Sequence, residues 1–200
     1  MLKRSITVLG LAFLMTACGF HLRGTGSTQM ALTELNFAAR DALSPLSKDV
    51  KQSLINNKVA ISSSAPFTLY LGLEEDSRRT ASFTAGTRSA EYTLTTALNY
   101  ELRSGNLPAL IQDSVAVQRS YAYNQNNVTG SGQEEALLRQ EMRRELVMQL
   151  MMRLQAITPT QLDSLKSQAE RKERAAAEAR EAEIRAQQFE EPQQSPILIP

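Results

Sequence analysis

The stretch Glu134–Ile157, EEALLRQEMRRELVMQLMMRLQAI, decides the fold because it is the longest helical pattern in the chain. One apolar residue recurs at every fourth position, which is typical of a helix that packs on a single apolar surface. This stripe consists of Leu138, Met142, Leu146, Leu150 and Leu154. A second apolar face consists of Val147, Met148, Met151 and Met152. The second face either packs against another helix of this chain or contacts a partner, since Met side chains are adaptable.

The surface that this helix covers is predicted by three earlier segments, in which apolar and polar residues alternate. Alternation at a period of two is typical of a strand with one buried face. The first segment contains Phe67, Leu69, Leu71 and Leu73, the second Tyr92, Leu94, Leu98, Tyr100 and Leu102, and the third Ile111, Val115, Val117, Tyr121 and Tyr123. Because the segments follow one another closely, we expect an antiparallel meander with one covered face.

Shorter elements precede the meander. Residues 33–37 alternate as a strand does, and residues 59–62 are compatible with another short strand. Between them, Ser44-Pro45 places an N-cap residue before a proline at the first helical position, which predicts a helix over Pro45–Asn56. The element order therefore predicts an α+β fold over residues 31–157. The segment Asn124–Gln133 is polar and uncharged, and we expect it to be a flexible loop before the long helix.

The chain changes character after Thr158-Pro159, so residues 158–200 are interpreted as a charged extension outside the domain. Ala, Glu, Arg and Gln dominate residues 168–188, and pairs such as Glu170–Arg174 favour a solvated helix. A coiled coil is an alternative, although Lys172 and several alanines stand where a seam would need Leu. The last ten residues contain three prolines and are expected to be disordered.

The N-terminus has the layout of an export signal that ends at the only cysteine. Lys3 and Arg4 precede an apolar run from Ile6 to Ala17, which is too short to span a bilayer. Met15-Thr16-Ala17-Cys18 resembles a bacterial lipobox, so we expect residues 1–17 to be a lipoprotein signal peptide and Cys18 to be acylated. Residues 18–30 would form a lipidated tether, since several acyl chains anchor a protein firmly. Gly19, rather than Asp, after the cysteine indicates the outer membrane.

Composition excludes several classes of function. The net charge is +1, and removing Lys3 and Arg4 with the signal lowers it by two, to −1, which gives no reason to expect nucleic acid as a partner. One His and one Cys cannot form a zinc site, and no nucleophile elbow or phosphate loop is present. The sequence therefore predicts no enzyme, no metal and no cofactor.

The residues after the cysteine carry a more specific signal. Cys18–Gly24, CGFHLRG, resembles the opening of the LptE family, and so does the segment Ala90-Glu91-Tyr92 at the start of the second long strand. The resemblance covers roughly residues 18–157. It implies a two-layer sandwich of two helices on a four-stranded mixed sheet, here with the charged C-terminal helical extension added. It also implies a lipoprotein that plugs the LptD β-barrel, helps it fold and binds lipopolysaccharide. The alternative is a scaffold lipoprotein of a different outer-membrane assembly machine.

A candidate binding site lies at a predicted hairpin tip. Arg78, Arg79 and Arg88 flank Ala85-Gly86-Thr87, and guanidinium groups bind phosphates in bidentate fashion. With the family resemblance, these three arginines are candidates to bind the phosphorylated lipid A part of lipopolysaccharide. The alternative is that Glu74, Glu75 and Asp76 simply neutralise Arg78 and Arg79. The loop before the long helix lacks the basic residue that some relatives place there, which puts a charge contact at that loop in doubt.

Overall fold

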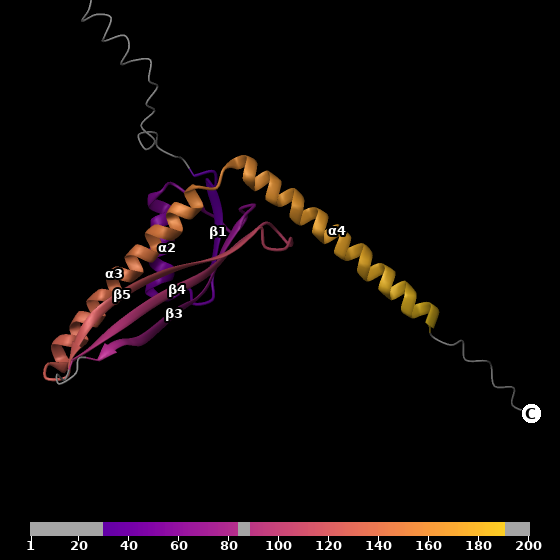
Figure 1. Cartoon of the computed structure of the whole chain (residues 1–200). Coiled ribbons are helices and arrows are strands. Elements are labelled where there is room, and N and C mark those ends of the chain that lie inside the picture. Colours follow the sequence, from indigo (N-terminus) through magenta and orange to yellow (C-terminus); the bar gives the residue numbers. More distant parts are fainter. Residues whose placement is uncertain (1–29, 84–88, 191–200) are drawn as a thin grey trace, which may run out of the picture.

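The computed structural model describes residues 30–83 and 89–190, and its centre is a mixed sheet with two helices on one face (Figure 1). The strands are β1 (Glu34–Ala39), β2 (Ala60–Ile61), β3 (Thr68–Phe83), β4 (Ser89–Arg103) and β5 (Ile111–Asn124). The helices are α2 (Pro45–Asn56), α3 (Val128–Gln155) and α4 (Pro159–Glu190). The predicted α+β class is confirmed. The sheet has five strands in the order β2-β1-β3-β4-β5, because the two-residue strand β2 pairs with β1 at one edge.

The predicted meander is present. Strands β3, β4 and β5 pair antiparallel, whereas β1 pairs in parallel with both β2 and β3, which makes the sheet mixed. Helix α2 has the bounds that the sequence predicts, and the Ser44 hydroxyl accepts a hydrogen bond from the Ser47 backbone N–H as an N-cap should.

Helix α3 begins earlier than the sequence indicates. It starts at Val128 rather than Glu134, because the Asn127 side chain accepts a hydrogen bond from the Gly130 backbone N–H and caps the helix. The Asn124–Gln133 segment is therefore mostly the first turns of α3, and the prediction of a flexible loop over all of it was wrong. Two glycines and several polar residues give this segment a low helix propensity, so the sequence pattern did not indicate that a helix starts at Asn127.

The core lies between the sheet and helices α2 and α3. Four residues of the predicted α3 stripe are fully buried, Met142, Leu146, Leu150 and Leu154, and Leu138 is partly buried against the same cluster. The second apolar face of α3 is divided. Val147 and Met151 are buried in this cluster, while Met148 and Met152 are 55% and 53% exposed. The interpretation that another helix packs on this face is confirmed in part, since α2 packs on α3, and contact of the two uncovered methionines with a partner stays a prediction.

A β-bulge in β3 changes which residues face the helices. Leu71 pairs with Tyr100, and the next pair is Glu74 with Leu98. Two residues of β3, Gly72 and Leu73, therefore lie opposite the single residue Asn99 of β4. Leu73 is consequently 44% exposed, and the prediction that it shares the buried face of Leu69 and Leu71 was wrong. A Cβ on Gly72 would lie 3.1 Å from the Asn99 backbone oxygen, so glycine allows the close approach that the bulge requires.

Replacement of Gly72 by Ala should destabilise the fold, by about 1–3 kcal/mol, because the strand must shift away from Asn99. Gly132 is the matched control. A Cβ there meets no atom within 4 Å, and Gly132 lies inside α3, so Gly132→Ala should stabilise the fold by about 0.5–1 kcal/mol. Urea unfolding of both variants measures the two effects. Destabilisation of similar size by both substitutions would contradict the close approach at the bulge.

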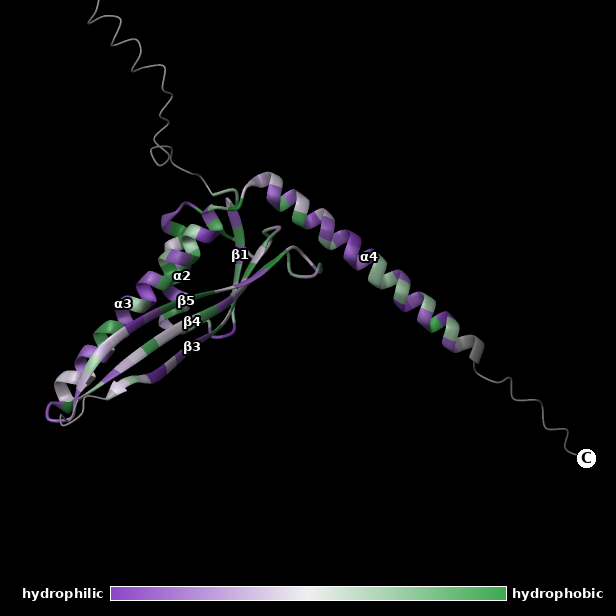
Figure 2. Ribbon diagram, viewed as in Figure 1, coloured by the Kyte–Doolittle hydropathy of each residue, from purple (hydrophilic) through white to green (hydrophobic). Residues whose placement is uncertain are grey.

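Helix α4 is longer than the sequence indicates. It begins at Pro159 because Thr158 and Gln161 form a reciprocal capping box, in which the Thr158 hydroxyl accepts from Gln161 N–H and Gln161 Oε1 accepts from Thr158 N–H. Leu162, in the first turns, is buried in the core cluster. The rest of α4 leaves the domain, and hydrophilic colours predominate along it (Figure 2). In the described ranges, no helix is long and apolar enough to cross a membrane.

The two ends of the domain differ. The described chain starts near the junction of α3 and α4, while the end of β3, the start of β4 and the start of α3 lie at the opposite end (Figure 1). Strand β3 has 16 residues, which corresponds to about 50 Å at the usual strand rise. The domain is therefore elongated, with the start of the described chain at one end and the paired ends of β3 and β4 at the other.

Candidate functional site

Two of the four residues singled out in the sequence lie in the described part of the chain. Cys18 and Arg88 lie outside it, and so does the tip Ala85-Gly86-Thr87. Arg78 and Arg79 are exposed on β3 near the hairpin, where they pair with Leu94 and Thr93 of β4. Neighbouring side chains of a strand point to opposite faces of the sheet. The Arg78 side chain therefore lies on the face that the helices cover, and the Arg79 side chain lies on the opposite face, which we call the open face.

The Arg78 guanidinium is held by two groups. Its Nη1 is 3.2 Å from Glu135 Oε2 of α3, and its Cζ lies 4.9 Å from the centre of the Tyr92 ring. The Tyr121 hydroxyl donates a 2.5 Å hydrogen bond to the same Glu135 oxygen. The acidic partner of Arg78 is therefore a residue of α3 and not Glu74, Glu75 or Asp76, which were the neighbours expected to neutralise it. Half of the Arg78 side chain, 49%, stays exposed.

Arg78 is one end of a row of contacts between α3 and β3. We call this row the ion-pair seam, and it consists of Arg78–Glu135 at 3.2 Å, Asp76–Arg139 at 3.3 Å and Glu74–Arg143 at 3.2 Å. Successive helix members are four residues apart and successive strand members two apart. Four helical residues advance about 6 Å and two strand residues about 6.6 Å, so the two spacings match. The bulge at Gly72 turns the strand members toward α3, because it shifts their alternation by one residue.

The contacts around Glu135 shift the pKa values of three groups, Glu135, Tyr121 and Arg78. Burial favours the neutral form of Glu135, but the Tyr121 hydrogen bond and the charges of Arg139 and Arg78 outweigh it and lower the pKa of this carboxyl. Burial, together with the hydrogen bond to Glu135, raises the pKa of the Tyr121 hydroxyl. Contacts with Tyr121 and Glu135 raise the pKa of Arg78. All three groups therefore keep their usual charge near neutral pH, which preserves the Arg78–Glu135 ion pair there.

Glu135→Gln should destabilise the fold at neutral pH, by about 1–3 kcal/mol, because it removes the anionic partner of Arg78 and one of the two anionic partners of Arg139. A carboxyl with a lowered pKa adds stability that is present above its usual pKa of 4.5 and is lost as the pH falls through the lowered value. The difference between wild type and variant should therefore shrink in acid. Urea unfolding at about pH 7 and about pH 3 tests this pH dependence. Glu134→Gln, at the adjacent exposed position, should change neither value.

Strand β5 is also tied to α3. Arg119 pairs with Glu145, and Arg153 pairs with Asp113 and donates a 2.7 Å hydrogen bond to the Ser114 backbone oxygen. A backbone hydrogen bond within Asp113-Ser114, together with Arg153, lowers the pKa of the Asp113 carboxyl. Helix α3 is thus joined by ion pairs to both sides of the meander, and its position on the sheet is fixed by charge as well as by the core.

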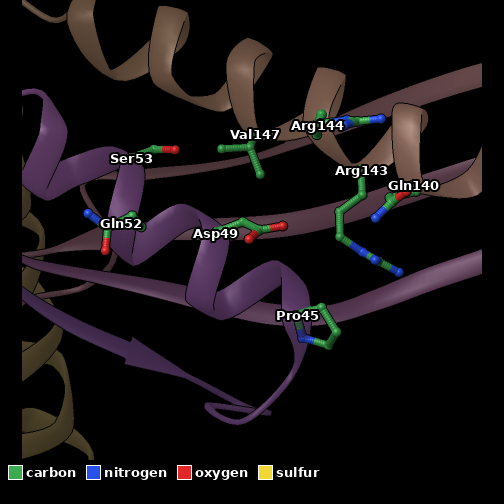
Figure 3. A pocket seen from close by; sticks show the side chains of 8 residues that line it. All are labelled: Pro45, Asp49, Gln52, Ser53, Gln140, Arg143, Arg144 and Val147. Carbon is green, nitrogen blue, oxygen red and sulfur yellow. The ribbon is translucent and has the colours of Figure 1, made fainter.

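A cavity of about 500 Å³ lies between α2 and α3 (Figure 3). Asp49 and Gln52 reach it from α2, and Arg143 and Arg144 from α3. Its lining mixes charges of both signs and includes no His or Cys. Within residues 30–83 and 89–190, no cluster of three or more His, Cys, Asp or Glu side chains could hold a metal ion.

Comparison with known proteins identifies the family. The family described as LptE, lipopolysaccharide-assembly, matches residues 30–154, which is more than half of the chain. The chain belongs to the LptE family. Members of the LptE family are assembly lipoproteins and not enzymes, so the prediction that the chain is not an enzyme is confirmed by its family.

Individual relatives agree with the LptE assignment. The LPS-assembly lipoprotein LptE of Photorhabdus laumondii is 32% identical over 154 residues, which is 74% of this chain and 82% of that protein. The LPS-assembly lipoprotein LptE of Pectobacterium atrosepticum is 32% identical over 161 residues, 77% of this chain and 86% of that protein. The resemblance in Cys18–Gly24 and Ala90-Glu91-Tyr92 therefore indicated the correct family.

Solved structures share the LptE-like fold. The rare lipoprotein B from Shewanella oneidensis superposes with a TM-score of 0.55 at 22% identity, covering 60% of this chain and 92% of that one. The uncharacterized lipoprotein B from Nitrosomonas europaea gives a TM-score of 0.59 at 16% identity, covering 73% of this chain and 96% of that one. At these identities the likeness supports the fold alone.

Sequence reasoning missed the ion-pair seam. The signal was present as opposite charges at matched spacings, with Glu135, Arg139 and Arg143 on the helix and residues 74, 76 and 78 on the strand. Recognising it requires the bulge, because without the extra residue the same strand members alternate out of phase with Leu69 and Leu71. The bulge itself is indicated in the sequence only by a single glycine, Gly72.

Proposed function

We propose that this LptE-family chain is an outer-membrane lipoprotein that plugs and helps assemble the LptD β-barrel and binds lipopolysaccharide during its insertion at the cell surface. In this proposal residues 1–17 are a signal peptide, Cys18 carries the acyl anchor, residues 18–30 are a tether and residues 31–157 are the plug. Family membership and the name LPS-assembly lipoprotein, which the relatives bear, support this function.

The length of the domain supports the placement in a barrel. A bilayer with its headgroup regions is about 40–45 Å thick, and strand β3 alone extends about 50 Å. The described chain starts at the end of the domain opposite the paired ends of β3 and β4 (Figure 1), and the proposed tether precedes that start. A domain that is anchored at the inner leaflet and lies along the barrel axis therefore brings the hairpin with Arg78 and Arg79 to the level of the outer leaflet.

The residues on the open face of the sheet support the proposal that this face lies against a polar surface. In the described part of the chain no helix covers this face, and its central residues on β4 and on β5 are small or neutral, whereas Glu91, Glu101 and Arg103 lie toward the ends of β4. The small or neutral residues include Thr93, Thr95, Ala97, Gln112, Ser114, Ala116, Gln118, Ser120 and Ala122. A β-barrel lumen is lined with polar groups. The centre of such a face fits against a polar wall, and that wall can also accept the charged residues at its ends, which would be costly to bury in an apolar surface.

The hairpin arginines are proposed to contact the lipid A phosphates. Arg78 and Arg79 start from opposite faces of β3, so one phosphate does not lie between them, and each is available to a separate anionic group. Arg78 already forms an ion pair with Glu135, whereas Arg79 forms no ion pair within the described residues. Arg79 is therefore expected to contribute more to lipopolysaccharide binding than Arg78.

The triple variant Arg78→Ala, Arg79→Ala and Arg88→Ala should weaken lipopolysaccharide binding by at least about tenfold at low salt, since charge-assisted hydrogen bonds contribute about 1.5–3 kcal/mol each. The difference should decrease as salt screens the charges. A direct binding assay with purified lipopolysaccharide at two salt concentrations measures both effects.

A second triple variant is the matched control. Arg171→Ala, Arg174→Ala and Arg180→Ala removes the same charge from exposed positions of α4 and should leave the affinity unchanged. Equal affinity of the hairpin variant and wild type would remove these arginines from the lipopolysaccharide site, whereas equal weakening by both variants would show only a net-charge effect. The single variant Arg79→Ala should weaken binding more than Arg78→Ala.

A further inference from the structure

The outer edge of β5 is an unused hydrogen-bonding edge. Strand β5 pairs with β4 on one side, and among residues 30–83 and 89–190 no strand pairs with its other side. Edge strands of this length are templates for the addition of another strand, so native proteins protect them. The way in which β5 is protected shows which part of the edge stays open.

The backbone groups that point to the outer edge belong to the even-numbered residues of β5. In an antiparallel pair, each residue directs both its N–H and its C=O either toward the partner strand or away from it. The Ser114 and Gln118 oxygens accept hydrogen bonds from arginine side chains, and the Asn124 N–H donates to the Ser131 hydroxyl. None of these groups is directed toward β4, so residues 112–124 with even numbers present their N–H and C=O outward.

Side chains bond to this edge at three places and leave two gaps, a shorter one at Ala116 and a longer one at Ser120 and Ala122. Arg153 donates a hydrogen bond to the Ser114 oxygen, and Arg119 donates one to the Gln118 oxygen. The Ser131 hydroxyl accepts a hydrogen bond from the Asn124 N–H. Ser120 and Ala122 lie between the last two places. In the part of the chain that the structure describes, no strand and no side chain bonds to their outward backbone groups. Two donors and two acceptors are therefore available side by side.

A groove runs along the longer gap. Its volume is about 470 Å³, and Ser120 and Tyr121 of β5 form one wall, while Leu137 and Leu138 of α3 lie in the other. Leu137 is 63% exposed, an apolar side chain of α3 that the core does not cover. An edge strand beside an apolar helix face is the arrangement that binds extended peptides, because the backbone gives affinity and the side-chain pocket gives specificity.

The charge of the groove limits its occupant. Glu134 and Glu141 line it, and neither forms an ion pair within the described residues. A second copy of this chain would bring the same two carboxylates from its own groove close to them, which repulsion disfavours. A segment that carries apolar and basic side chains in alternation satisfies both Leu137 and the carboxylates.

We propose that a short extended segment of the β-barrel partner, with alternating apolar and basic side chains, pairs with β5 at Ser120 and Ala122 and occupies the groove beside Leu137. This inference rests on the proposed function for the identity of the partner. Pairing uses the outward N–H and C=O of both residues, and an apolar side chain of the segment contacts Leu137.

Hydrogen exchange in the complex tests the pairing. The full lipoprotein is produced together with the barrel, purified as the complex, and compared with the lipoprotein alone. The Ser120 and Ala122 amides should exchange at least about tenfold more slowly in the complex, because exchange reports the hydrogen bonding of each amide. The Ala116 and Gln118 amides also point outward but lie beyond the groove, and they should exchange equally in both samples.

Two variants at exposed positions of α3 separate the groove from the rest of the interface. Leu137→Glu should abolish the slower exchange at Ser120 and Ala122, whereas Met148→Glu, at a site of similar exposure, should preserve it. A complex in which these two amides exchange as fast as in the free protein would overturn the inference and leave the proposed function intact. Slow exchange in the free protein that increases with its concentration would assign the edge to a second copy and also overturn it. Failure to obtain any complex would overturn both proposals.

Discussion

Truncation of Leu146 to Ala should destabilise the domain by about 2–5 kcal/mol, the usual cost of removing a fully buried leucine side chain. Leu146 lies in the middle of the α3 stripe and is 0% exposed, in the core cluster that joins α3 to the sheet. The residues around it belong to elements that are fixed by ion pairs, so the cavity cannot collapse easily. Urea unfolding of the domain measures the change.

The control for this prediction is on the same helix. Leu137→Ala removes the same atoms from a position that is 63% exposed, and it should change the free energy of unfolding by no more than about 0.5 kcal/mol. Equal effects of the two substitutions would mean that α3 does not cover the sheet with the stripe identified in the sequence. The buried stripe would then not be what holds α3 to the meander.

Replacement of Cys18 by Ser should abolish acylation and remove the protein from the membrane fraction. The thiol is the only nucleophile at the proposed lipobox, and serine does not replace it in the transfer of a diacylglyceryl group. Several acyl chains hold a protein firmly to a bilayer, whereas a chain without them has no comparable anchor. Incorporation of labelled palmitate and fractionation of membranes measure the two effects.

A displaced thiol provides the control for the anchor. The double variant Cys18→Ser and Gly26→Cys retains one cysteine eight residues further along the chain, beyond the lipobox. It should behave like Cys18→Ser alone, because the thiol no longer follows Ala17. Normal labelling of the double variant would contradict the lipobox assignment and would place the acylation signal elsewhere.

Local signals predicted much of the fold. Ser44-Pro45 located the start of α2, since a cap and a first-turn proline act within one turn. The alternation in β3, β4 and β5 gave the antiparallel meander, and the α3 stripe gave its cover. These elements are determined by residues close in sequence, and their burial follows from periodicity alone.

The bulge, the seam and the helix starts were not predictable in the same way. Gly72 shifts the alternation of β3, and its reason, the Asn99 oxygen, belongs to another strand. The seam joins residues that are 57 to 69 positions apart in the sequence, so no local pattern shows the pairing. The cap at Asn127 was visible, but the glycines after it obscured the start of α3. Thr158-Pro159 repeats the cap-and-proline pattern of Ser44-Pro45 and was not recognised as the start of α4.

The candidate site was predicted in its location but not in its geometry. The sequence placed Arg78 and Arg79 near a hairpin end, and β3 does carry them there. It treated them as one cluster, whereas the strand places them on opposite faces and Glu135 of α3 holds one of them. The lipopolysaccharide contacts therefore remain a proposal in which Arg79 has the larger part.

The measurement that tests the central claim most directly is purification of the native lipoprotein in mild detergent, with identification of every stoichiometric companion. We predict one β-barrel protein of the LptD type in a one-to-one complex that survives purification, together with an acylated Cys18. Isolation of the lipoprotein alone, or with a different barrel, would contradict the account.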